Sequence, residues 1–157
     1  MKKLFLLRHA EAIREPGLAD IDRPLTSQGQ EQARKLADIL LKNSLIPDLI
    51  ITSTAVRALK TAEIVIKQIG YQSRIEKSLQ LYESDSLKHI SVIQSCAKDE
   101  SSVMIIGHNP VLEELLSSLT ESQKHLSTGS LAELELMIGE WKELSLKTSA
   151  ILLHLYK

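Results

Sequence analysis

The chain has 157 residues, of which 43% are hydrophobic and 25% charged, a composition that is ordinary for a soluble globular protein. This length suits one domain over residues 1–157 with a substantial buried core. Because 19 basic and 20 acidic residues leave a formal net charge of −1, the composition favours neither nucleic acid nor an anionic membrane surface as a partner.

Cysteine usage and the N-terminal segment indicate the compartment. Cys96 is the only cysteine, which excludes an internal disulfide framework and a metal site built on a cysteine cluster. A protein of this kind is expected in a reducing environment. The apolar run at positions 4–7 is too short for a signal peptide, and no apolar stretch approaches the length that spans a membrane. The sequence therefore predicts a soluble cytoplasmic protein.

Apolar runs alternate with segments of helical periodicity along the chain. The runs at positions 3–7, 49–51 and 103–106 are bounded by polar or turn residues, as is typical of strands buried on both faces. Apolar residues spaced three and four apart predict amphipathic helices that begin near Ser27 and Thr54.

The later elements complete this alternating pattern. A third helix is expected after Asp85, and Asn109 as N-cap with Pro110 at the first helical position predicts a fourth. Apolar and polar residues alternate over 132–138, which predicts a half-exposed strand, and 151–156 is expected to form the last strand. The pattern predicts an α/β fold: a three-layer α/β/α sandwich whose central sheet is mainly parallel, with an antiparallel edge.

Two of the buried strands end directly in a histidine. His9 follows the first run and His108 follows the third, each separated from the last apolar residue by one position, Arg8 and Gly107 respectively. In open α/β sheets, ligands bind just beyond the carboxyl ends of the strands. We therefore expect both imidazoles at one site, with Arg57 close by because it lies in the first turn of the second helix.

Four motifs occur in order along the chain. Arg8 and His9 follow the first strand, Arg23 precedes Pro-Leu-Thr, Arg57 lies within Thr-Ala-Val-Arg-Ala-Leu-Lys-Thr-Ala, and His108 lies within Gly-His-Asn-Pro. Together they resemble the histidine phosphatase superfamily, also called phosphoglycerate mutase-like, whose short members are typified by SixA-type phosphohistidine phosphatases. The resemblance covers nearly the whole chain.

The chain departs from the family pattern at one position. The first motif of the family usually ends in glycine, whereas this chain has Ala10. If that position required a positive φ, alanine would be strained there.

The resemblance implies that His9 attacks phosphorus and becomes transiently phosphorylated. A free imidazole has a pKa of about 6.5, so much of it is neutral and nucleophilic at pH 7. Arg8, Arg23 and Arg57 would bind the phosphate, because their planar, permanently charged guanidinium groups match its oxygens. His108 would donate a further hydrogen bond, best when it is protonated.

Glu83 is the nearest match to the family's acidic proton donor, although an exposed loop carboxylate is an equally good interpretation. A protonated imidazole leaves phosphorus readily, so a strong general acid is less necessary for phosphohistidine than for an alkyl ester. The chain has no insertion long enough to form a lid, and an open site suits a phosphohistidine on another protein. No acidic cluster has metal-ligand spacing, so we expect a metal-independent enzyme without a cofactor.

Alternatives remain open at this point. The leading hypothesis is a phosphatase for phosphohistidine in a partner protein, and a small-molecule phosphomonoesterase is the first alternative. A mutase is disfavoured because such enzymes are generally longer. Ala10 is the one feature that favours a phosphate-binding regulatory module without turnover, and a metallohydrolase using His9 and His108 lacks a carboxylate at suitable spacing. The sequence leaves the oligomeric state open. Three further histidines are expected at the surface or at sheet edges: His89, His125 and His154.

Overall fold

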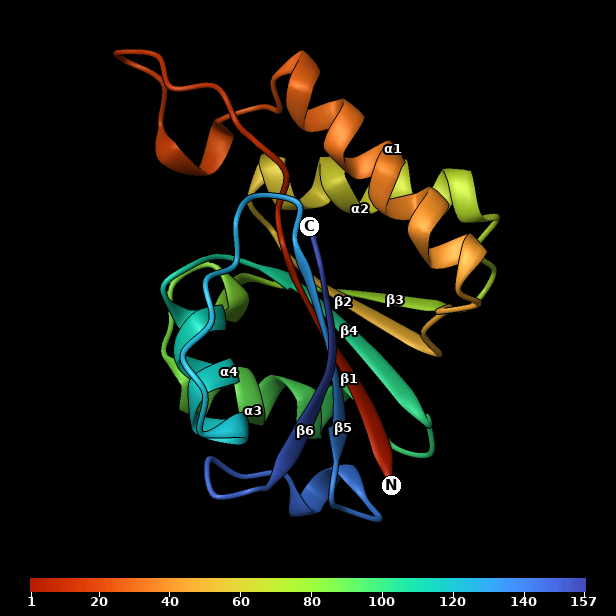
Figure 1. The fold of residues 1–157 in the computed structure, drawn as a ribbon. Coiled ribbons are helices and arrows are strands. Elements are labelled where there is room, and N and C mark those ends of the chain that lie inside the picture. The colour runs from red at the N-terminus through yellow and green to blue at the C-terminus, as the bar shows by residue number, and fades with distance from the viewer.

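The computed structural model describes residues 1–157 as a six-stranded sheet between two layers of helices (Figure 1). The predicted α/β/α sandwich is confirmed. The strands are β1 (Lys2–Arg8), β2 (Leu49–Ser53), β3 (Arg74–Ser78), β4 (Ser102–Gly107), β5 (Leu131–Leu136) and β6 (Ala150–Tyr156). The helices are α1 (Ser27–Lys42), α2 (Val56–Ile69), α3 (Ser86–Cys96) and α4 (Val111–Thr120), with short 3₁₀ turns at Asp20–Asp22, Leu79–Leu81 and Trp141–Glu143.

The strand order is β3-β2-β4-β1-β5-β6. The first four strands of the chain run parallel, and β5 and β6 add antiparallel pairs beside β1. The register of the two central strands sets Leu7 opposite Ile106 and Arg8 opposite Gly107. The next residue of each strand is therefore a histidine, and the two histidines leave the sheet side by side.

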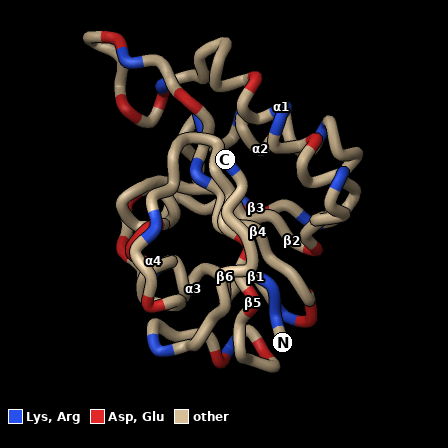
Figure 2. Tube along the Cα trace, in the orientation of Figure 1, with Lys and Arg blue, Asp and Glu red and all other residues tan.

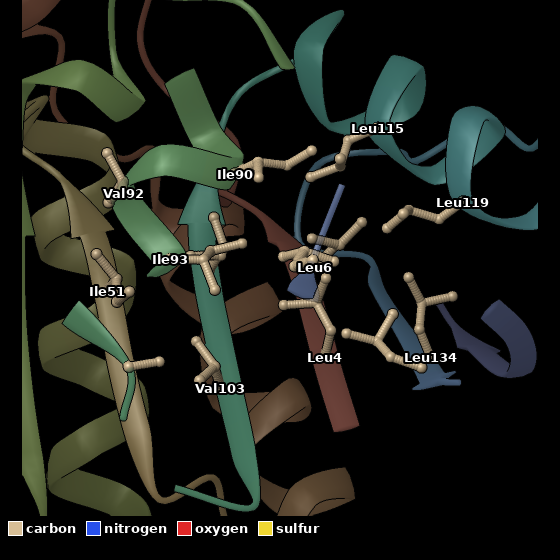
Figure 3. Close-up of a cluster of buried hydrophobic side chains, with 14 of the residues drawn as sticks. Leu4, Leu6, Ile51, Ile90, Val92, Ile93, Val103, Leu115, Leu119 and Leu134 are labelled. Carbon is tan, nitrogen blue, oxygen red and sulfur yellow. The ribbon is translucent and has the colours of Figure 1, made fainter. Parts of the chain in front are cut away.

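Both faces of the central strands are buried. Leu4 and Leu6 of β1 and Val103 of β4 pack towards α3 and α4, which contribute Ile93 and Leu115 to the same cluster (Figure 3). The alternate side chains of these strands pack in a second cluster, against α1 and α2. Burial on both sides is the reason these strands are continuous apolar runs rather than alternating ones.

The helix ends follow local sequence signals, with one exception. The Thr26 side chain accepts a hydrogen bond from the Gly29 N–H at the start of α1, as an N-cap should. At the start of α4 the N-cap is Pro110, so the expectation that Asn109 caps this helix is wrong. The Asn109 amide instead donates to the Glu113 carboxylate and to the Leu126 carbonyl.

One strand was missed, because the sequence pattern did not predict β3, and two further expectations are wrong. Strand β5 is not half-exposed, because it lies between β1 and β6 and its Glu133 is 5% exposed, paired with Lys3 at 2.6 Å. His89 is buried in α3, where its Nδ1 donates to the Asp85 carbonyl at 3.0 Å, and so it is not a surface residue.

Charged residues of both signs are interspersed along the helices and loops (Figure 2). None of the helices combines the length and the apolar character needed to cross a membrane.

Candidate active site

A cavity of about 390 Å³ lies at the carboxyl ends of the central strands. Every residue that the sequence analysis assigned to the site lines this cavity. Its lining consists of Arg8, His9, Arg14, Asp20, Arg23, Arg57, Tyr82, Glu83, His108 and Asn109. His9, Arg57 and His108 are buried at its base, whereas Arg14 and Glu83 are exposed at its mouth.

The hydrogen bonds of His9 define which ring nitrogen carries the proton. Its Nδ1 lies 2.7 Å from the Ala10 carbonyl oxygen, which can only accept, so Nδ1 is the protonated nitrogen. Its Nε2 lies 3.3 Å from Nε of Arg57, which can only donate, so Nε2 carries the lone pair. The tautomer inferred from these partners places the lone pair of the ring on Nε2, where Arg57 is its hydrogen-bond donor in the ligand-free site.

The surroundings of His9 also keep the ring neutral. Burial is the largest cause, and the positive charges of Arg57, Arg8 and Arg23 add to it, so that the pKa of His9 falls from 6.5 to about 4. The hydrogen bond to Ala10 opposes this shift without cancelling it. At neutral pH the imidazole is therefore uncharged.

His108 stands beside His9, with 5.1 Å between the ring centroids. Its Nε2 is hydrogen-bonded to Oγ of Ser53 at 2.8 Å, and its Nδ1 is buried without a partner. Burial, followed by His9 and Arg57, lowers the pKa of His108 to about 3. The ring is therefore neutral in the free site, and only a bound anion would favour the protonated state expected from the sequence.

Arg57 and Arg23 converge on one carboxylate. Arg57 donates to Asp20 twice, from Nη1 to the carbonyl oxygen at 2.7 Å and from Nη2 to Oδ2 at 3.1 Å. Arg23 donates from Nε to Oδ1 at 3.0 Å, and the Tyr82 hydroxyl donates to Oδ2 at 2.6 Å. These donors, Tyr82 foremost, hold the pKa of Asp20 far below its usual range. The guanidinium groups are thus held in position before any phosphate arrives.

Arg8 is fixed from the other side of the cavity. Its Nη1 donates to the Leu126 carbonyl at 3.0 Å, and its Nε is buried without a partner. Burial lowers the pKa of Arg8. A half-buried cation whose buried Nε has an unused donor beside the His9 imidazole is a good binding group for an oxyanion.

Ala10 fits its place without strain. It does not adopt a positive φ, and its methyl group is fully buried in the core beneath α2. Its N–H donates to Oγ1 of Thr61 at 3.0 Å. The structure thus contains no backbone conformation at this position that would require glycine.

Five residues of the site were missed by the sequence analysis, and one of them, Asn109, had been assigned only as a helix cap. Ser53 ends β2, a place that strand-end reasoning could have identified, whereas Asp20, Tyr82 and Arg14 lie in loops whose course the sequence does not reveal. The Glu83 side chain lines the cavity and makes no hydrogen bond or ion pair within the chain, whereas its backbone N–H donates to the Leu79 carbonyl at 3.3 Å.

Comparison with known proteins identifies the family. A family model described as histidine phosphatase superfamily (branch 1) matches residues 4–86. An uncharacterised chloroplast protein of Arabidopsis thaliana is 31% identical over 152 residues, which cover 90% of this chain and 70% of the relative. A 2,3-bisphosphoglycerate-dependent phosphoglycerate mutase of Elusimicrobium minutum is 36% identical over 107 residues, but the match spans only 41% of the mutase.

A crystal structure provides the corresponding match in three dimensions. A protein assigned as the phosphohistidine phosphatase SixA of Agrobacterium tumefaciens superposes with a TM-score of 0.85 at 27% identity. The superposition covers 99% of this chain and 97% of the other. The chain therefore belongs to branch 1 of the histidine phosphatase superfamily and is a phosphatase of the SixA type.

Proposed function

We propose that residues 1–157 act as one domain, a metal-independent phosphatase that removes phosphate from phosphohistidine in a partner protein. The observation that carries the proposal is the state of His9. A neutral ring with its lone pair on Nε2, beside three guanidinium groups, suits nucleophilic attack on a bound phosphoryl group.

In the first step, Nε2 of His9 forms a bond to phosphorus while the bond from phosphorus to the leaving imidazole breaks. Arg8, Arg23 and Arg57 stabilise the charge on the three phosphoryl oxygens. His108 adds a hydrogen bond to the same oxygens. The leaving imidazole takes a proton, for which Glu83 at the mouth is the proposed donor.

In the second step, water attacks phosphorus in line with His9, and the bond to Nε2 breaks. The water gives up a proton, which Glu83 accepts if it served as the donor, and the products are inorganic phosphate and neutral His9. Each step exchanges one bond at phosphorus for another, and dividing the transfer in this way lowers the barrier of each part.

The exposed mouth of the cavity favours a protein over a small molecule as the substrate. The cavity opens between Arg14, Asp20 and Glu83, all of them exposed, and a phosphorylated side chain on another protein can enter there. The similarity to the Agrobacterium SixA structure favours the same substrate class. The similarity to a phosphoglycerate mutase favours a second candidate, a phosphatase for small phosphorylated molecules.

A comparison of substrates tests the choice. The purified chain should dephosphorylate a phosphohistidine-bearing domain with a much higher kcat/KM than any member of a panel of phosphorylated metabolites. Rapid acid-free quenching with ³²P-labelled substrate should trap label on the protein that is stable in base and absent in His9→Ala. A strong preference for metabolites would replace the proposal with the second candidate, and no label together with no turnover would indicate a binding module.

A further inference from the structure

Tyr82 differs in chemistry from the rest of the cavity lining. Apart from the two histidines at the base, it is the only aromatic side chain there, and every other lining residue carries a charge or an amide. Its hydroxyl donates to Asp20. Its ring packs edge-on against His108, with centroids 5.5 Å apart at 72°, and lies 5.8 Å from the guanidinium carbon of Arg57.

The position of Tyr82 between the base and the mouth matters for the reaction. His9 and His108 at the base are less than 10% exposed, whereas Asp20 and Glu83 at the mouth are exposed and Tyr82 is half-buried between them. In an in-line transfer the leaving group lies opposite the attacking atom. A phosphoryl group captured by His9 therefore directs its leaving group away from the base, past Tyr82.

We propose that Tyr82 is a specificity-determining residue whose ring contacts the planar leaving group of the substrate, an aromatic ring such as the imidazole of phosphohistidine. The inference rests on the proposed function and adds to it the chemistry of the leaving group. The carboxylates of the lining offer no flat surface to an aromatic ring, and Arg23 and Arg57 are held by Asp20. The ring of Tyr82, in contrast, can stack on an aromatic ring. The arginine beside Tyr82 holds its ring in one orientation.

Two substrates, of which only one has an aromatic leaving group, test this contact. Phosphoimidazole and phosphoramidate both carry a phosphorus–nitrogen bond, but only the first has an aromatic leaving group. Because Tyr82 also packs against Arg57 and His108, we expect Tyr82→Leu to slow both reactions. The measured quantity is kcat/KM for phosphoimidazole divided by kcat/KM for phosphoramidate. A purely supporting role of Tyr82 would leave this ratio unchanged.

The ratio should fall by about two- to tenfold in Tyr82→Leu, the size of one aromatic pair. Tyr82→Phe keeps the ring and loses only the hydrogen bond to Asp20, so its ratio should equal that of the wild type. An unchanged ratio in Tyr82→Leu would overturn the contact, and so would an equal fall in Tyr82→Phe.

A failure of the proposed function has a different signature. If neither phosphorus–nitrogen compound is hydrolysed but phosphate esters are, the same ratio is measured with phenyl phosphate and ethyl phosphate. A ring-dependent loss in Tyr82→Leu would then support the contact although the phosphohistidine proposal had failed. If phosphoimidazole is hydrolysed through labelled His9 but the ratio is the same in Tyr82→Leu and the wild type, the phosphohistidine proposal stands and the contact with Tyr82 is wrong.

Discussion

Nε of Arg57 donates a hydrogen bond to Nε2 of His9 over 3.3 Å. One contact therefore links the proposed nucleophile to a phosphate-binding cation. It orients the lone pair, and the same positive charge helps to keep the ring unprotonated. When a phosphoryl group enters, Nε of Arg57 can donate to a phosphoryl oxygen in place of the ring nitrogen. The N–H that orients His9 in the free site can then stabilise the transition state.

Loss of this side chain should be costly. Arg57→Ala is expected to lower kcat/KM about 10²- to 10³-fold, as removal of one fixed electrostatic donor does. Arg57→Lys should recover only part of the activity, because lysine keeps the charge but not the planar fork. Steady-state kinetics measure both. Lys60→Ala is the matched control, since Lys60 lies on the same helix but pairs with Glu63 outside the cavity. Full activity in Arg57→Ala would contradict the site described above.

Ser53 should hold the ring of His108. Ser53→Ala removes the 2.8 Å hydrogen bond to Nε2, which leaves both nitrogens of a buried imidazole without partners, and it also removes the acceptor of the Ala55 N–H at 3.2 Å. We expect the free energy of unfolding to fall by about 1–3 kcal/mol, together with a loss of kcat. Urea denaturation and kinetics measure the two effects.

The neighbouring residue provides an isosteric control for this change. Oγ1 of Thr54 is buried without a hydrogen-bond partner, so Thr54→Val should leave stability unchanged or raise it. Equal destabilisation by Ser53→Ala and Thr54→Val would argue that packing, and not the hydrogen bond to His108, determines the effect.

Asp20 should compete with phosphate. Its carboxylate accepts hydrogen bonds from Arg23, Arg57 and Tyr82, which are also groups of the phosphate cavity. Asp20→Asn keeps the shape and removes the negative charge. We expect inorganic phosphate to inhibit this variant at concentrations several-fold lower, because the anion no longer meets a like charge. Weaker inhibition would show that the carboxylate helps binding by positioning the arginines.

The protonation of His9 can be measured directly. Because its pKa is lowered from 6.5 to about 4, the ring should remain neutral as the pH falls through 6.5 and take up a proton only near pH 4. Two-dimensional ¹H–¹⁵N spectra of the imidazoles should show the Nδ1–H tautomer at pH 6. The acid limb of kcat/KM for an acid-stable ester should likewise lie well below pH 6.5. Bound phosphate should shift the titration upward, and a midpoint near 6.5 in the free protein would contradict the burial argument.

Metal removal should have no effect. The structure contains no group of three or more histidine, cysteine, aspartate or glutamate side chains that could hold a metal ion, and guanidinium groups supply the positive charge at the site. Dialysis against EDTA is expected to leave kcat and KM unchanged. A loss of activity that Mg²⁺ or Zn²⁺ restores would overturn this prediction.

Periodicity located only the site residues tied to regular elements, whereas Arg23 and Glu83 lie in loops and were found through the family resemblance. His9 and His108 end buried strands, and Arg57 lies in the first turn of a helix, so periodicity alone places all three at one edge of the sheet. Asp20 and Tyr82 reach the cavity through loops, which have no periodicity from which a position could be calculated. Strand β3 was missed because its one isoleucine lies among charged residues. The tautomer of His9 depends on partners that only the folded chain brings together.

Leu7 and Arg8 on β1 pair with Ile106 and Gly107 on β4, and the two histidines continue these rows by one residue. The separation of the imidazoles is consequently fixed by main-chain hydrogen bonds in the most deeply buried part of the protein. A slip of one residue between these strands would carry one histidine to the opposite side of the sheet. The surrounding loops can therefore change in sequence, and with them the preferred substrate, while the spacing of the two imidazoles stays the same.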